Sequence, residues 1–166
     1  MTDTPQTQVA RAWHQNDPAL DVRPIEVFGR LRHLQDQHDQ ALSPLYSGAP
    51  INESEIAVLI FLRHAEGPTI ARRLAAQRGC SAAAMGKLLT KLGSRGLVTR
   101  RPNPADRRAV LVEITEAGRE IVDEYFPRQL ALEAEILDGL PDEWVAQLIV
   151  SMDELAARLR RHQDQI

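Results

Sequence analysis

The apolar residues of this 166-residue chain recur with a helical period of about 3.6 almost everywhere, and the pattern changes at one place only. Between residues 97 and 114 the period falls to 2, in two short runs, LVT at 97–99 and VLVEI at 110–114, on either side of a polar loop. This alternation is typical of a β-hairpin. The sequence therefore predicts a mainly α fold with one small β-hairpin.

Start and stop signals divide the rest of the chain into helices. The start signals are Asn52, Thr69, Ser81, Thr115 and Pro141, and the stop signals are Pro44, Gly67, Gly79 and Gly96. Asn52 and Glu55 have the spacing of a capping box, so a helix start is strongly indicated there. We expect a short amphipathic N-terminal helix, a long helix from Pro24 to the break at Pro44 and Gly48-Ala49-Pro50, three short helices before the hairpin and two closing helices after it.

Basic residues are concentrated in the middle of the chain. Residues 67–108 contain ten Lys or Arg side chains and one acid, Asp106, which gives a local charge of +9. The whole chain carries −3, so the remainder carries −12. The ten cations are Arg72, Arg73, Arg78, Lys87, Lys91, Arg95, Arg100, Arg101, Arg107 and Arg108. This separation of charge is what a phosphate-facing surface requires on an otherwise acidic protein.

The order of the expected elements also indicates a surface that faces nucleic-acid phosphates. A helix, a second helix, a turn, a third helix and a two-stranded hairpin make a winged helix-turn-helix. In this arrangement the last helix enters the major groove of DNA and the hairpin, or wing, reaches a neighbouring minor groove. We therefore expect a protein that binds double-stranded DNA.

The helix that starts at Ser81 is the expected reading helix. Its apolar face takes Met85, Leu88, Leu89 and Leu92, which leaves the opposite face toward solvent or DNA. The residues expected to contact DNA from this helix and the wing are Ser81, Ala82, Ala83, Gly86, Lys87, Thr90, Lys91, Arg95, Arg101, Asp106, Arg107 and Arg108.

Small side chains on the reading helix permit close approach and can touch thymine methyl groups, whereas its hydroxyls and ammonium groups can bond phosphates or bases. Ala82 and Ala83 are explained equally well as ordinary helix formers. No Asn or Gln stands on this face to read adenine, so specificity would depend partly on DNA shape. Arg100 and Arg101 alternate faces of a strand, so we expect one of them to meet DNA.

Residues 96–122, GLVTRRPNPADRRAVLVEITEAGREIV, resemble the wing signature of the MarR family of bacterial transcription regulators. More loosely, the resemblance extends over residues 25–160. It implies a homodimer that binds a pseudo-palindromic operator, often released by a small ligand. It also implies that residues 1–166 form a single MarR-type domain, with dimerisation helices at 1–50 and 115–166 and a DNA-binding winged helix-turn-helix lobe at 52–114.

The aspartate and arginine of the wing match a pair that relatives in this family use. Asp106 and Arg108 have the spacing at which the carboxylate can hold the guanidinium for insertion into the minor groove. Arg107 could take the same role, and a purely structural salt bridge is the alternative.

Long apolar stripes at both ends of the chain also favour a homodimer. They lie on residues 25–45, 115–137 and 141–159, and they offer more apolar surface than a small winged motif can cover. The alternative is that these helices cover each other within one chain.

A tryptophan ahead of the long first helix resembles the urate-responsive branch of the family, in which Trp13 would lie near a ligand pocket. That branch has an aspartate and an asparagine where this chain has Ala57 and Lys87, so urate is not the expected ligand and Trp13 serves as a packing anchor. Another small-molecule effector remains open, with Trp13, Arg30, His33 and His64 as candidate ligand-binding residues for an anionic compound.

Several classes of function are not indicated. We find no glycine-rich phosphate loop, nucleophile elbow or paired histidine and acid at catalytic spacing, so we expect neither an enzyme nor a cofactor. The single Cys80 is expected to be a low-polarity filler and not an oxidation sensor, and no metal site is expected. Apolar runs are far shorter than the ~20 residues of a membrane span, and the N-terminus lacks a signal-peptide pattern.

We therefore expect a cytoplasmic DNA-binding regulator, with repression favoured because a roadblock at a promoter needs no further surface. The alternative is a helical protein-interaction adaptor that keeps a winged fold without binding DNA. Salt dependence separates the two, since binding through several phosphates falls steeply with salt.

Overall fold

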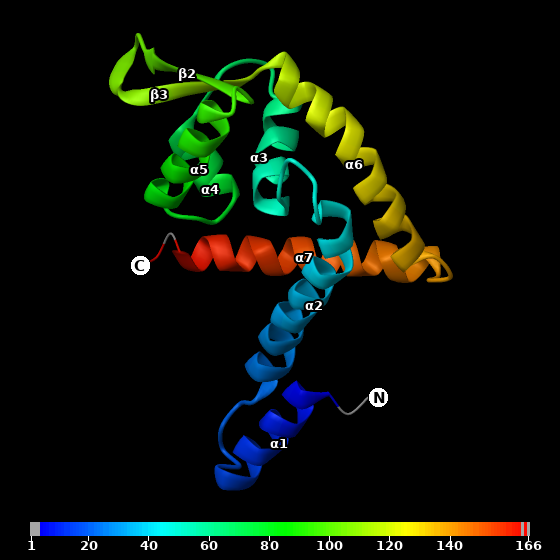
Figure 1. The fold of residues 1–166 in the computed structure, drawn as a ribbon. Coiled ribbons are helices and arrows are strands. Elements are labelled where there is room, and N and C mark those ends of the chain that lie inside the picture. The colour runs from blue at the N-terminus through cyan, green and yellow to red at the C-terminus, as the bar shows by residue number, and fades with distance from the viewer. Residues whose placement is uncertain (1–3, 164, 166) are drawn as a thin grey trace. The chain divides into compact units, whose positions relative to one another are not determined.

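The computed structural model describes residues 4–163 and residue 165 and has the expected mainly helical composition with one small sheet (Figure 1). The helices of the described residues are α1 (Pro5–Asn16), α2 (Arg23–Tyr46), α3 (Glu53–Arg63), α4 (Ala71–Gln77), α5 (Ala82–Ser94), α6 (Glu116–Leu137) and α7 (Asp142–Gln163), and the strands are β1 (Thr69–Ile70), β2 (Val98–Asn103) and β3 (Asp106–Ile114). The chain divides into two compact units, one that ends at Gln129 and one that begins at Leu130.

Three helix starts are capped as the sequence indicates. At α3 the capping box is complete, because the Glu55 N–H donates to Asn52 Oδ1 at 3.0 Å and the Asn52 N–H donates to Glu55 Oε2 at 3.1 Å. The Ala84 N–H donates to Ser81 Oγ at 3.1 Å at the start of α5. The Gly118 N–H donates to Thr115 Oγ1 at 3.1 Å before the first turn of α6. Satisfied N–H groups explain why the chain begins its helices at these residues.

The predicted hairpin is present and belongs to a three-stranded sheet in the order β1-β3-β2. β2 pairs antiparallel with β3, with Val98 opposite Ile114. The third strand corrects a sequence prediction, since Thr69 does not cap a helix but pairs with Val112 in β1. A strand of two residues has no periodicity of its own, so only its pairing with β3 identifies it as a strand.

The long helix α2 passes through Pro44 and ends at Tyr46, within the break that the sequence predicts over residues 44–50. Pro44 lies in the last turn, and the Ser47 N–H still donates to the Ser43 carbonyl oxygen at 3.0 Å. Proline removes one N–H donor and disturbs the carbonyl one turn earlier, so its cost is small when few helical bonds remain to be made.

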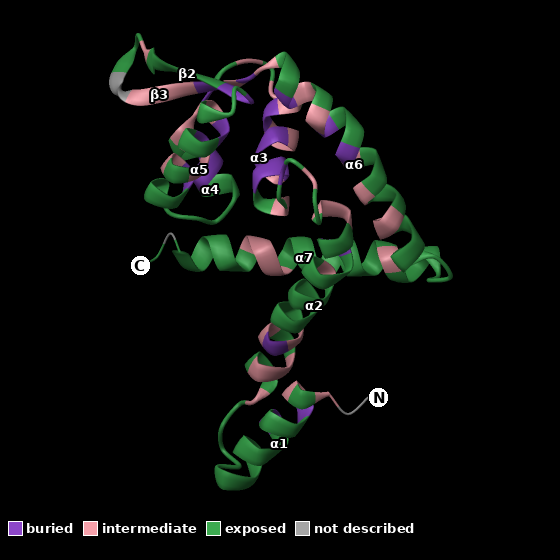
Figure 2. Cartoon of the chain, in the orientation of Figure 1, coloured by how far each residue is buried: buried purple, intermediate pink, exposed green. Residues whose placement is uncertain are grey.

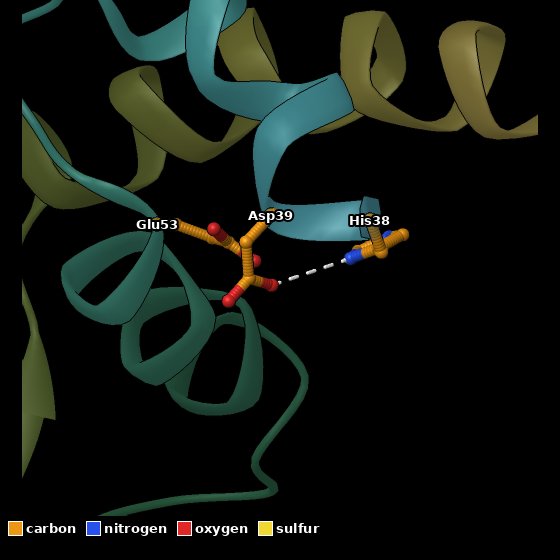
Figure 3. A group of neighbouring side chains, drawn as sticks. All are labelled: His38, Asp39 and Glu53. Carbon is orange, nitrogen blue, oxygen red and sulfur yellow. Dashed lines mark ion pairs between the residues drawn. The ribbon is translucent and has the colours of Figure 1, made fainter. Parts of the chain in front are cut away.

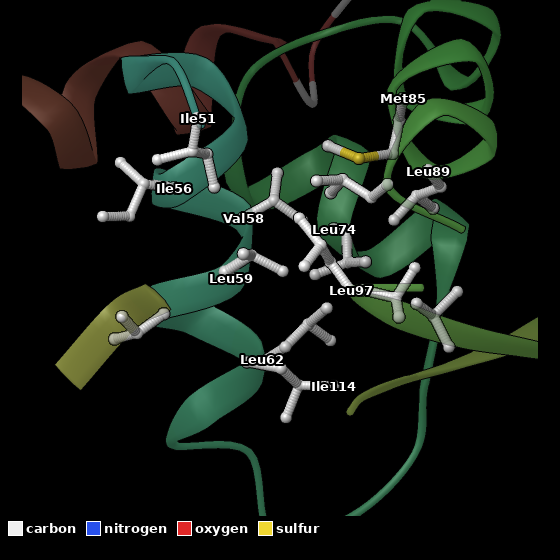
Figure 4. Close-up of a cluster of buried hydrophobic side chains, with 14 of the residues drawn as sticks. Ile51, Ile56, Val58, Leu59, Leu62, Leu74, Met85, Leu89, Leu97 and Ile114 are labelled. Atoms are coloured by element: carbon white, nitrogen blue, oxygen red, sulfur yellow. The ribbon is translucent and has the colours of Figure 1, made fainter. Parts of the chain in front are cut away.

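One hydrophobic core holds the winged helix-turn-helix together (Figures 2 and 4). Its buried side chains come from α3, α4, α5, the sheet and the first half of α6, and include Ile56, Leu59, Leu74, Met85, Leu89, Leu92, Val112 and Val122. The core lies on the inner side of α5 and thereby determines which face of that helix remains outside.

Candidate nucleic-acid interface

The outer face of α5 carries the residues that the sequence places against DNA. Met85, Leu89 and Leu92 are buried and Leu88 is half-buried, which confirms the predicted apolar face. On the opposite side Ala82, Ala83, Lys87 and Thr90 are exposed and Gly86 is half-buried. A Cβ atom added at Gly86 would meet no heavy atom within 4 Å, so open space lies beside the helix there.

Two cations at the C-terminal end of α5, Lys91 and the capping residue Arg95, are held by a carboxylate of α3. Glu55 is only 1% exposed, and Lys91 Nζ forms an ion pair with its Oε1 at 2.8 Å. Arg95 donates from one guanidinium nitrogen to Glu55 Oε2 at 3.0 Å and from another to the Pro50 carbonyl oxygen. The structure thus gives two of the expected DNA-contacting residues a partner within the protein.

The ionisation of Glu55 follows from these contacts. Burial alone would raise the pKa of its carboxyl, but bonds from Lys91, the Asn52 N–H and Arg95 outweigh burial and lower that pKa below its usual value. Glu55 is therefore ionised at neutral pH, and its buried carboxylate faces the positive charges of Lys91 and Arg95.

The wing lies next to α5 and is tied to it (Figure 1). Arg100 of β2 donates to Thr90 Oγ1 at 2.7 Å, and that hydroxyl donates to the Gly86 carbonyl oxygen at 2.9 Å. Arg101, the next residue along β2, is exposed. The alternation along the strand therefore turns Arg100 toward α5 and leaves Arg101 on the other face.

The side chains of Arg107 and Arg108 lie outside the described residues. The predicted pairing of Asp106 with Arg108 therefore stays a prediction.

Five of the remaining cations are exposed, and no hydrogen bond or ion pair joins their side chains to the part of the chain that the structure describes. They are Arg72, Arg73, Arg78, Lys87 and Arg101, from α4, its end, α5 and β2. All five belong to the helix-turn-helix or its wing, where charge of one sign attracts the phosphate backbone.

The four candidate ligand-binding residues do not meet in one place. Arg30 and His33 line a depression of about 520 Å³ between α1 and α2. His64 lines a different depression, of about 760 Å³, beside the loop that follows α3. Trp13 lines neither and is 52% exposed, so it does not anchor α1 in the single chain. That role falls to the buried Thr7 and Ala10, and Arg30 donates to Thr7 Oγ1 at 2.8 Å.

Sequence analysis gave no indication of one further group, His38, Asp39 and Glu53 (Figure 3). Their possible ligand atoms lie within 4.8 Å of one another, but they come from α2 and α3 and have no motif spacing. Imidazole and carboxylates are ligands that zinc accepts. Asp39 is exposed, accepts a hydrogen bond from Gln35 at 2.6 Å and lies 3.7 Å from His38 Nδ1, so ordinary surface contacts within α2 also explain its position.

Two further observations complete the comparison with the sequence. Cys80 lies at the turn between α4 and α5 and is exposed, so it is not the buried filler that we expected. The turn excludes it from the core because Gly79, with φ +61°, directs the chain outward before α5 begins. Within the described residues, none of the helices is both long and apolar enough to span a membrane.

A capped helix with a small and basic outer face, tied to an antiparallel wing, defines a winged helix-turn-helix DNA-binding regulator. Comparison with known families agrees, since the sequence profile described as "MarR family" matches residues 51–110. The chain belongs to the MarR family, whose members are transcription regulators and not enzymes.

Individual relatives extend the match beyond the profile. The multiple antibiotic resistance protein MarR of Escherichia coli is 33% identical over 101 residues, which are 58% of this chain and 67% of MarR. The transcriptional repressor YetL of Bacillus subtilis is 21% identical over 146 residues, 87% of each chain. The crystal structure of a mutant E. coli MarR complexed with operator DNA superposes with a TM-score of 0.71 at 27% identity, covering 82% of this chain and 99% of that one.

Proposed function

We propose that this protein is a homodimeric repressor that binds a pseudo-palindromic operator and is released from it by a small ligand. The observation that carries the proposal is the set of exposed basic side chains on α4, α5 and the wing, with no acid exposed among them on α4 and α5. The proposed DNA contacts are Ser81, Ala82, Ala83, Gly86, Lys87, Thr90, Arg101, Asp106, Arg107 and Arg108, with Lys91 and Arg95 treated separately below. Such a regulator acts in the cytoplasm, where bacterial DNA lies.

Exposed apolar side chains support the homodimer. α7 has no buried residue in the single chain, and its Trp144, Leu148 and Met152 are 66%, 48% and 43% exposed. These side chains recur at intervals of four, so they form one apolar stripe along the helix. A second copy that covers the stripe would remove this surface from water, and a two-fold dimer would present two reading helices to DNA.

Charged residues on the stripe are expected to separate the dimer. The double variant Trp144→Glu and Met152→Glu should be a monomer at micromolar concentration, because two carboxylates would be buried in the interface. Sedimentation equilibrium gives the mass directly. The matched control is Ala146→Glu, which adds a charge on the opposite side of the same helix and should leave the mass unchanged. A dimeric double variant would contradict the proposed interface.

Repression by this protein and its release by a ligand are supported by different observations. The name of the relative YetL describes a repressor, and a dimer on a promoter blocks transcription without any further surface. For release we propose an anionic effector in the depression lined by Arg30 and His33. The pair Arg30→Ala and His33→Ala should leave operator binding intact while the response to the effector is lost.

The function is tested by titrating the purified protein against the intergenic DNA upstream of its own gene and against a scrambled duplex, at two salt concentrations. Selective binding that weakens steeply with salt is the expected result. No binding to either duplex would contradict the proposal and favour the protein-interaction adaptor.

Removal of one exposed cation from the reading helix is expected to weaken DNA binding generally. Lys87 is exposed, and no side-chain partner joins it to the described residues, so Lys87→Ala should reduce affinity for every duplex and lower the salt slope by about 1. Arg108→Ala should weaken the free energy of operator binding by about 1–3 kcal/mol and leave the dimer intact. Fluorescence anisotropy measures both. An unchanged slope for Lys87→Ala would remove it from the interface.

A further inference from the structure

We propose that Glu55 limits the number of phosphate contacts that the protein makes with DNA, because it holds Lys91 and Arg95 away from the phosphates. The inference rests on the DNA-contacting face proposed above. It assigns a positioning role to a residue of α3 that is itself 1% exposed.

The two cations are placed so that one carboxylate serves both. Lys91 lies in the last turn of α5 and Arg95 is the residue that caps this helix at its C-terminal end, so the two cations lie close together. Each approaches a different oxygen of Glu55, at 2.8 Å and 3.0 Å. The carboxylate is held in turn by the Asn52 N–H, so it cannot follow a cation that turns toward solvent.

A cation paired in this way is a poor phosphate ligand. To reach DNA it must leave a buried carboxylate that loses its partner, which is costly because the remaining charge is not solvated. Arg95 is held most firmly, since its side chain is 30% exposed and it also donates to the Pro50 carbonyl oxygen. Lys91 is 58% exposed, so it is the cation that the loss of Glu55 would release first.

Affinity for any duplex depends on the number of phosphate contacts. Each phosphate that the protein neutralises strengthens binding and its salt dependence whatever the sequence, whereas base contacts discriminate between sequences. Lys91 and Arg95 contribute little to phosphate binding while they are paired with Glu55, because the carboxylate occupies the place that a phosphate would otherwise take.

The test is a cycle of three variants, Glu55→Gln, Lys91→Gln and the double variant, each titrated with a scrambled duplex and with the operator over a range of salt. Glutamine at position 55 retains the capping box of α3, so the helix start is preserved while the charge is removed. Lys87→Gln is the matched control, because Lys87 lies on the same helix and has no contact with Glu55.

In the wild-type background, Lys91→Gln should leave the salt slope on scrambled DNA unchanged, whereas Lys87→Gln should lower it by about 0.9. Glu55→Gln should raise that slope by about 0.9 and tighten binding to both duplexes roughly fivefold at 0.15 M salt, because a phosphate contact carries no sequence information. Adding Lys91→Gln to Glu55→Gln should reverse the increase.

A loss of slope in Lys91→Gln alone equal to that of Lys87→Gln would overturn the inference, because Lys91 would then contact phosphate in the presence of Glu55. An unchanged slope in Glu55→Gln would also overturn it and leave Glu55 a purely structural residue. Failure of the proposed function is distinguishable, because the wild-type protein would then show no salt-dependent binding to either duplex.

Discussion

The Gly118→Ala variant is expected to unfold with a free energy about 3 kcal/mol lower than that of the wild-type protein. Gly118 is buried in the first turn of α6, where this helix passes the base of the wing. A Cβ atom there would come closer to the Leu97 carbonyl oxygen than real Cβ atoms do, and 2.7 Å from Ile114 Cγ1. Backbone cannot move aside, because the Thr115 N–H donates to the same carbonyl oxygen at 3.1 Å.

Urea unfolding followed by circular dichroism measures the change. Gly86→Ala is the matched control, because its Cβ would meet no heavy atom within 4 Å on α5. Removing a glycine from a helix interior should stabilise that variant by up to about 1 kcal/mol. If Gly118→Ala were as stable as the wild-type protein, the close packing of α6 against the wing would be wrong.

Glu55→Ala is expected to lower the free energy of unfolding by about 3 kcal/mol at neutral pH. The substitution removes the buried partner of Lys91 and Arg95 and also the second bond of the α3 capping box. Both cations remain partly exposed, which limits the loss because water can solvate them. Glu55→Gln retains the capping box and should lose about half as much.

The pH dependence of stability provides an independent measurement for Glu55. Its pKa in the folded protein is lowered, so the unfolded protein binds a proton at Glu55 more readily than the folded protein does. The contribution of the carboxylate is therefore complete above the unfolded pKa, near 4.5, and is lost as pH falls through the lower folded pKa. Urea unfolding from pH 7 to pH 3 should show the difference between wild type and Glu55→Gln shrink with acid. A constant difference would contradict the charged pairing.

Local signals in the sequence predicted the elements of the DNA-binding lobe well. The capping boxes and caps at Asn52, Ser81 and Thr115 are confirmed, because each depends on residues within three positions of one another. The hairpin is confirmed for the same reason, since period-2 alternation is a property of the strand itself. The mainly α winged fold and the MarR family assignment are confirmed as well.

The sequence did not predict features that depend on residues far apart in the chain. Thr69 joins a strand because β3 lies beside it, and no local signal announces that pairing. Trp13 is exposed because Thr7 and Ala10 already fill the contact of α1 with α2. Arg30, His33 and His64 were grouped by residue type, but the folded chain distributes them between two depressions.

The sequence by itself determined the class of the protein, because helix caps, strand alternation and the charge of a segment are all set by residues close together in the chain. Only the tertiary structure decided which cations of residues 67–108 remain available to DNA. Glu55 is 40 residues from Arg95 in the chain and 3.0 Å from it in space. A count of charges adds every lysine and arginine alike, whereas folding pairs some of them with a buried carboxylate and leaves others, such as Lys87, facing solvent.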